Sequence, residues 1–147
     1  MNFLHAPQLL YFAVMNQVEH IGVAVKNLDA SIALYTQLLG VKPYKTEEVA
    51  SEGVITAFFD AGNTKIELLC ATRPDSPIAK FIDKRGEGIH HIAFGVENIR
   101  DKIAEKKQAG FELINTEPKD GADNKLIVFL HPKSTGNVLV EMCEDKG

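Results

Sequence analysis

A pair of matching segments constrains the fold of this chain more than any other feature of its sequence. Residues 18–25 read VEHIGVAV, and residues 88–96 read GIHHIAFGV. In each segment a histidine, His20 or His91, is followed by strictly alternating large and small side chains. Successive side chains of a strand point to opposite faces, so each histidine shares its face with small residues. We expect two equivalent strands, each with space for a ligand beside its histidine and an opposite, bulky face that can pack a core.

The segments after the two histidine strands match as well. Asn27 and Gly40 bracket an apolar pattern of helical spacing in the first half, and Asn98 and Gly110 bracket one in the second. Three strand-like segments follow each helix: residues 42–49, 54–59 and 65–69, and then residues 111–115, 126–130 and 138–142. Both the histidines and the asparagines are 71 residues apart. A repeat in register predicts an α+β fold in which two βαβββ modules form one cupped mixed β-sheet.

The length of 147 residues fits one compact domain. We expect an N-terminal extension at residues 1–16 and a single domain at residues 17–147. This domain divides into module 1 at about residues 17–72, a connector at residues 73–86 and module 2 at about residues 87–147. In the connector, Ser76 and Pro77 are typical of the start of a short helix that ends at Arg85 and Gly86.

Composition narrows the choice of partners and compartment. A formal net charge of −4 argues against nucleic acid as the main partner, but it allows a local basic pocket for a phosphorylated substrate. The apolar residues 1–14 lack the basic start of a secretory signal and are too short to span a membrane. Two distant cysteines form no metal or redox motif. We expect a reduced, cytoplasmic protein that binds no membrane.

A lone glutamate interrupts the last apolar strand of each module. Glu67 and Glu141 each stand five residues after a glycine, Gly62 or Gly136, and between apolar neighbours. An ionised carboxylate in such a strand is costly unless it is paired or bound to a cation.

The two histidines and the two glutamates form one set if the modules pack about a twofold axis. Any one of them alone is more often a structural or solvated residue, but four in matched positions favour a metal site. Mixed nitrogen and oxygen ligands suit a divalent ion such as cobalt, manganese, nickel or zinc. The predicted ligands are therefore His20, Glu67, His91 and Glu141, which leave open positions on an octahedral ion for a bidentate substrate.

Other polar residues are weaker candidates. Alternation places His90 on the face opposite His91, as a core or interface residue. His131 lies in a turn from which it can reach a substrate, although turn histidines are usually solvated. Three lysines can meet phosphates, although surface lysines mostly meet water: Lys119, Lys125 and Lys133.

At these residues the sequence resembles the vicinal oxygen chelate superfamily and, within it, the methylmalonyl-CoA epimerase family. Four segments carry the resemblance: residues 19–25 (EHIGVAV), 63–69 (NTKIELL), 75–94 (from DSPIAKF to GIHHIAF) and 129–141 (from FLHPKS to VLVE). The strand pattern is shared across the superfamily, whereas the third and fourth segments point to the epimerases. The resemblance covers about residues 18–144.

The resemblance implies a cupped sheet of paired modules, usually in a homodimer. It implies a divalent metal, often cobalt(II), held by His20, Glu67, His91 and Glu141. Some members have glutamine at the second position, so Glu67 adds one negative charge here. The implied reaction interconverts the (R) and (S) stereoisomers of methylmalonyl-CoA, in propionate-type metabolism, by removing the α-proton through a metal-stabilised enolate.

The acid and base groups of that reaction stay open. Glu141 is a possible catalytic base if its carboxylate loosens from the metal. One branch of the family has a strand glutamate as base, and Thr56 occupies that position here. Glu47, Glu48 and Glu52 are alternatives near the cup.

Two other functions are compatible with the same residues. A glyoxalase I-like lyase acting on a glutathione hemithioacetal would share the four ligands. A metal-free small-molecule-binding module would share the fold but has no need of them.

Overall fold

The computed structural model describes residues 17–147, so the predicted extension at residues 1–16 lies outside the described residues. The strands are β1 (Gln17–Val25), β2 (Lys45–Val49), β3 (Val54–Asp60), β4 (Lys65–Ala71), β5 (Gly88–Gly95), β6 (Lys119–Gly121), β7 (Lys125–Leu130) and β8 (Val140–Asp145). The α-helices are α2 (Leu28–Leu39), α3 (Pro77–Arg85) and α4 (Ile99–Gln108), and two short 3-10 turns are η1 (Ala50–Glu52) and η2 (Pro132–Ser134). The order β–α–β–β–β therefore occurs twice, with α3 between the two copies.

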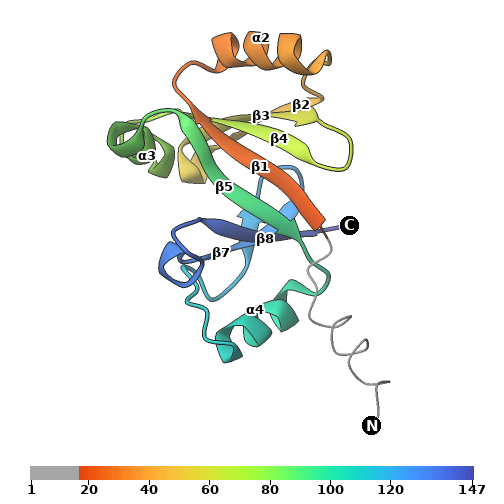
Figure 1. Cartoon of the computed structure of the whole chain (residues 1–147), viewed down its shortest axis with the longest axis vertical. Helices are drawn as coiled ribbons and strands as arrows, with labels where there is room; N and C mark the ends of the chain where they lie inside the picture. Colours follow the sequence, from red (N-terminus) through yellow and green to blue (C-terminus); the bar gives the residue numbers. More distant parts are fainter. Residues whose placement is uncertain (1–16) are drawn as a thin grey trace.

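All eight strands of residues 17–147 join one mixed sheet in the order β2-β3-β4-β1-β5-β8-β7-β6. The histidine strands β1 and β5 are antiparallel neighbours at its centre (Figure 1). Each pairs on its other side with the last strand of its own module, β1 with β4 and β5 with β8, and both of these pairs are parallel. The predicted α+β fold with a cupped mixed sheet is confirmed, and the glutamate strands flank the histidine strands.

The helices begin where side-chain capping is available. The Asn27 side chain accepts a hydrogen bond from the Ala30 N–H, and Ser76 accepts one from the Ala79 N–H, as expected of N-caps. Gly40 ends α2 with a φ of 74°, a conformation that glycine adopts without steric cost. None of the helices in residues 17–147 has the length and apolar character needed to cross a lipid bilayer.

Helices α2 and α4 cover the outer strands of the two halves of the sheet. Helix α2 packs on β3 and β4, where Phe59 and Leu68 are buried, and α4 packs on β7 and β8, where Val128 and Met142 are buried. On the opposite face, Ile78 of α3 packs against Ala24, Val54 and Leu69. Other residues of that face line a cavity inside the cup.

The prediction that the bulky face of the central strands packs the core was only partly correct. On that face Val25 and Val96 are buried in the core, but Ile21, Ile92 and Phe94 are only half-buried. The reason is that α2 and α4 lie over the outer strands and leave the middle of β1 and β5 less covered.

The predicted strand at residues 111–115 was wrong. Only Leu113 forms a bridge there, to Leu130, and the strand of this part of the module is β6 further along the chain. The Asn115 side-chain oxygen, in place of a backbone carbonyl, accepts the Phe129 N–H. Since that side-chain bond replaces the next rung of the ladder, the pairing stops before it becomes a strand.

Candidate metal centre

Two β-bulges in the central strand pair determine how the site is built. The register between β1 and β5 shifts twice, so that Glu19 in β1 and His90 in β5 have no partner across the pair. A bulge interrupts the alternation of side chains. As a result Glu19 Oε1 lies 2.9 Å from His20 Nδ1, and His90 Nδ1 lies 2.9 Å from His91 Nδ1. The prediction that His90 is a core or interface residue facing away from His91 was therefore wrong, because strict alternation does not hold at a bulge.

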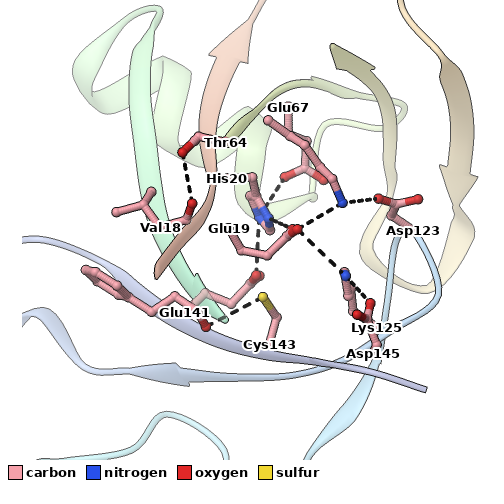
Figure 2. A network of polar contacts seen from close by, with 12 residues as sticks. Val18, Glu19, His20, Thr64, Glu67, Asp123, Lys125, Glu141, Cys143 and Asp145 are labelled. Atoms are coloured by element: carbon pink, nitrogen blue, oxygen red, sulfur yellow. Dashed lines mark hydrogen bonds and ion pairs between the residues drawn. The ribbon is translucent and has the colours of Figure 1, made fainter. Parts of the chain in front are cut away.

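The four predicted ligand side chains converge, and all four are buried. The Nε2 atoms of His20 and His91 are 3.0 Å apart. Glu67 Oε1 lies 3.6 Å from the first of these nitrogens and 3.5 Å from the second. Glu141 Oε2 lies 3.2 Å from His20 Nε2, and its Oε1 lies 3.9 Å from His91 Nε2. Figure 2 shows how Glu67 and Glu141 approach His20 from separate strands.

Small residues beside the ligands create the space that this convergence needs. Gly22 is the β1 partner of Glu67 in β4, and Ala93 is the β5 partner of Glu141 in β8. A Cβ atom on Gly22 would lie only 2.2 Å from Cε1 of the His91 ring. The small positions that alternate with the histidines in the sequence are thus required for the side chains to meet.

The charged groups of the site are arranged in a way that suits a bound cation. Burial raises the pKa of Glu67 to about 8, against the favourable charge of His20. Burial alone would lower the pKa of His20, but the neighbouring carboxylates of Glu141 and Glu19 raise it to about 10. The pKa of His91 is well below its usual value because of burial and its two histidine neighbours. Glu141 Oε2 is buried without a hydrogen-bond partner, although it lies near His20.

This donor set fits a divalent metal ion. Ligand atoms about 2.1 Å from an ion, and at right angles to each other, lie about 3 Å apart. The ligand atoms of His20, Glu67 and His91 lie 3.0–3.6 Å apart, and a cation between them would relieve the cost of the buried Glu67 carboxylate. These three residues are compatible with a divalent ion, whereas Glu141 as the fourth ligand stays a prediction.

A buried network of charges supports the His20 side of the centre (Figure 2). Burial works against ionisation of Glu19, but hydrogen bonds with His20 and Lys65 lower its pKa to about 2. Its Oε2 lies 2.9 Å from Lys65 Nζ and 3.7 Å from Lys125 Nζ. Lys125 is buried and also pairs with Asp145. Lys125 is therefore part of this network and not a surface lysine free to meet a phosphate.

A cavity of 260 Å³ adjoins the centre, and its wall includes Glu67, His91 and Glu141. Of the three proposed alternative bases, Glu52 lines it and forms an ion pair of 2.7 Å with Lys119, which also lines it. Glu48 does not line the cavity, and neither does Glu47, which pairs with Lys45.

Of two further residues considered in the sequence, Thr56 and His131, only Thr56 lines this cavity. Thr56 lines the cavity, and its hydroxyl donates a hydrogen bond to the Glu47 carbonyl. The His131 ring instead accepts a hydrogen bond from the Lys133 N–H within its own turn. The residues that sequence reasoning missed are Glu19 and His90, whose contacts with the ligand histidines depend on the bulges.

Residues 19–129 match the family described as the Glyoxalase/Bleomycin resistance protein/Dioxygenase superfamily, and the chain belongs to it. Within this superfamily the chain is 39% identical, over 134 residues, to the ethylmalonyl-CoA/methylmalonyl-CoA epimerase of Cereibacter sphaeroides, covering 88% of this chain and 98% of that protein.

Solved structures agree with this assignment. A hypothetical protein from Bacillus halodurans is 46% identical with a TM-score of 0.86, over 89% of this chain and 95% of that one. A variant of Streptomyces coelicolor methylmalonyl-CoA epimerase in complex with 2-nitronate-propionyl-CoA is 34% identical with a TM-score of 0.85, over 91% of this chain and 97% of that one. The chain is thus related to methylmalonyl-CoA epimerases in both sequence and fold.

Proposed function

We propose that this protein is a metal-dependent epimerase that interconverts (R)- and (S)-methylmalonyl-CoA. The observation that carries the proposal is the convergence of His20, Glu67, His91 and Glu141 beside a cavity that the last three line. The similarity to named epimerases over nearly the whole described chain supports the choice of substrate.

The residues around the centre have distinct supporting roles. We assign His20, Glu67, His91 and Glu141 as ligands of a divalent ion, with cobalt(II) favoured and manganese, nickel or zinc as alternatives. When bound, the ion supplies a Lewis acid that stabilises the negative charge developing on the thioester oxygen of the substrate. Glu19 and His90 hold the outer nitrogens of the two histidine rings, and such contacts fix the orientation of a ligand histidine.

Epimerisation requires a proton to leave C-2 of the substrate and return on the opposite face. We assign Glu141 as one acid/base group, since its Oε2 atom is buried without a hydrogen bond and its carboxylate borders the cavity. Glu52 is our candidate for the second group, because it lines the same cavity and Thr56 has no side chain able to act as that base. A positioned acid/base group contributes about 10²–10⁴-fold to the rate.

We also propose a homodimer located in the cytoplasm. The half-buried apolar side chains of Ile21, Ile92 and Phe94 offer a surface on the central strands for a second copy. The free thiols of Cys70 and Cys143 agree with a reducing compartment.

The deciding experiment measures exchange of the substrate α-proton with deuterium from heavy water. Methylmalonyl-CoA is incubated with metal-loaded protein, with and without a chelator. We expect metal-dependent exchange accompanied by loss of stereochemical purity. The variant Glu141→Gln should lower the exchange rate at least 100-fold, whereas the exposed Glu48→Gln should leave it unchanged.

Two results would assign a different function. Absence of exchange by metal-loaded protein would refute the epimerase, and formation of a thioester from a glutathione hemithioacetal would then identify a glyoxalase I-like lyase. Failure of the purified protein to retain any divalent metal would identify a metal-free binding module.

A further inference from the structure

The β6–β7 hairpin of the second module contacts the first module at Asp123. Strands β2 and β6 are the two edges of the sheet that residues 17–147 form, and no strand pairing joins them. The turn between β6 and β7 nevertheless reaches β2, where the Asp123 N–H donates a hydrogen bond to Glu47 Oε1 over 3.1 Å. Within the described residues the Asp123 carboxylate also accepts from side chains of the first module: Tyr44, Lys45 and Lys65. One residue of the second module is thus bound to several parts of the first.

These contacts hold the Asp123 carboxylate in one orientation. The Tyr44 hydroxyl donates to Oδ2 over 2.9 Å, and the Lys65 ammonium group donates to the same oxygen over 3.2 Å. Lys45 Nζ lies 3.5 Å from the other oxygen, Oδ1. Burial works against ionisation, but the hydrogen bonds from Tyr44 and Lys65 lower the pKa of Asp123. The side chain is therefore an ionised carboxylate with donors on both of its oxygens.

Lys65 connects this carboxylate to the metal centre. Its Nζ lies 3.2 Å from Asp123 Oδ2 and 2.9 Å from Glu19 Oε2. Figure 2 shows Asp123 and Glu19 joined by these two successive contacts. The other oxygen of Glu19 lies 2.9 Å from His20 Nδ1. A series of three contacts therefore runs from the hairpin of the second module to a ligand ring of the first.

The orientation of Lys65 depends on the second acid. A lysine carries its charge on a flexible four-carbon stem, and the Lys65 side chain is partly exposed, so conformations that point into solvent are open to it. Asp123 restricts the ammonium group to the position beside Glu19. Lys125 holds Glu19 less closely, because its Nζ lies 3.7 Å away and also pairs with Asp145. Loss of the Asp123 charge would therefore loosen the Glu19 carboxylate.

We propose that Asp123 is a positioning residue of the metal centre: it holds Lys65 against Glu19 and thereby fixes the carboxylate that orients the His20 ring. A hydrogen bond to the outer nitrogen of a ligand histidine sets the orientation of the ring and leaves the other nitrogen for the metal. The proposal rests on the part of the proposed function that assigns His20 as a ligand, and it does not depend on the substrate. The hairpin of the second module must therefore be in place for His20 to be fully oriented.

The first test follows the Nδ1 proton of the His20 ring by NMR in the metal-free protein. Asp123→Asn removes the charge that attracts Lys45 and Lys65. It keeps a residue type that tolerates the left-handed backbone at this position, where φ is 59°. Because the Glu19 carboxylate would be held less firmly, the His20 proton should exchange with solvent faster in this variant, by about fivefold or more.

The matched control is Glu105→Gln, which likewise removes two ion pairs, with Lys102 and Lys106, but on α4. It should leave the exchange of the His20 proton unchanged. Tyr44→Phe removes one donor from the Asp123 carboxylate and should speed the exchange to a smaller extent, so the test does not depend on a single variant. Equal exchange in Asp123→Asn and Glu105→Gln would overturn the proposal.

The second test measures the affinity for cobalt(II) by calorimetry. Asp123→Asn should raise the Kd by about fivefold or more, since changes to the partner of a ligand histidine cost about 10–100-fold. Lys65→Met should raise the Kd by a similar factor. The double variant should bind no more weakly than Lys65→Met alone, because Asp123 acts through that lysine. Additive effects would mean that the Asp123 charge acts on the metal from a distance, and they would overturn the positioning role.

Two outcomes separate this proposal from the proposed function. If the unmodified protein binds cobalt(II) and Asp123→Asn binds it as tightly as Glu105→Gln does, the positioning role is wrong and the metal-dependent function stands. If the metal-loaded protein catalyses no exchange of the substrate α-proton, but Asp123→Asn still weakens metal binding and loosens His20, the epimerase is refuted and the positioning role is supported.

Discussion

The space around the metal centre can be tested by adding one methyl group to Gly22. A Cβ at this position would lie 2.2 Å from Cε1, 2.5 Å from Nδ1 and 2.9 Å from Nε2 of the His91 ring. Ordinary contact begins at 3.4 Å. The ring must therefore retreat by about 1.2 Å, whereas metal–ligand distances tolerate deviations of only about 0.2 Å.

The Gly22→Ala variant should consequently lose its metal before it loses its fold. His91 is buried and has His20, His90 and Phe129 as ring neighbours, so the displaced ring has little free space to enter. Overpacking of this kind costs roughly 1–3 kcal/mol of stability, which leaves a well-folded protein. We expect metal affinity to fall by about 100-fold or more, since changes that only reorient a ligand already cost about 10–100-fold.

The assay is metal content and metal affinity after loading, with thermal unfolding of the metal-free protein measured in parallel. Gly95→Ala is the matched control, because its Cβ would meet only Glu19 Cβ and Cγ at 3.8 Å, an ordinary contact. Gly22→Ala protein that binds metal as tightly as the Gly95→Ala protein would refute the argument that His91 is a ligand held in place by the absent side chain.

Three further predictions concern stability and protons. Ser76→Ala removes the α3 N-cap and should destabilise the protein by about 1 kcal/mol in chemical denaturation, whereas Ser51→Ala, in an exposed turn, should have little effect; equal effects would exclude the cap as the cause. Because the pKa of Glu19 falls from 4.5 to about 2 on folding, its stabilising contribution is present above pH 4.5 and is lost as the pH falls towards 2. The Glu19→Gln variant should therefore lose less of its free energy of unfolding over this pH range. An unchanged pH dependence would refute the role of Glu19. The pKa values of Glu67 and His20 are about 8 and about 10, so both side chains hold a proton at pH 7 in the metal-free protein. Metal binding at pH 7 should therefore release protons, and metal affinity should increase as the pH rises. Calorimetry in two buffers of different ionisation enthalpy would detect the proton release, and a binding enthalpy that does not depend on the buffer would contradict this prediction.

The sequence predicts that His20, Glu67, His91 and Glu141 converge, because the signal for each residue is local. A glutamate between apolar residues and a histidine among small ones are each visible within a single strand, and the repeat doubles the evidence. Each of these inferences needs only the strand that carries the residue.

The contacts behind the ligands could not be predicted, because they depend on how two strands are aligned. The bulges at Glu19 and His90 are properties of the β1–β5 pair, and neither sequence segment alone departs from simple alternation. The end of the ladder at Asn115 likewise depends on a side chain that reaches the neighbouring strand.

The antiparallel pairing of β1 with β5 gives the centre the symmetry of a dimer within one chain. Each module contributes one histidine from this pair and one glutamate from the parallel strand beside it. A single ancestral module would have completed such a centre only by pairing with a second copy of itself across a twofold axis. In this chain residues 73–86 join the two copies, and their equivalent positions differ: an acid lies beside His20 and an imidazole beside His91. The two sides of the centre therefore differ in charge, although the strands that carry them are related by the repeat.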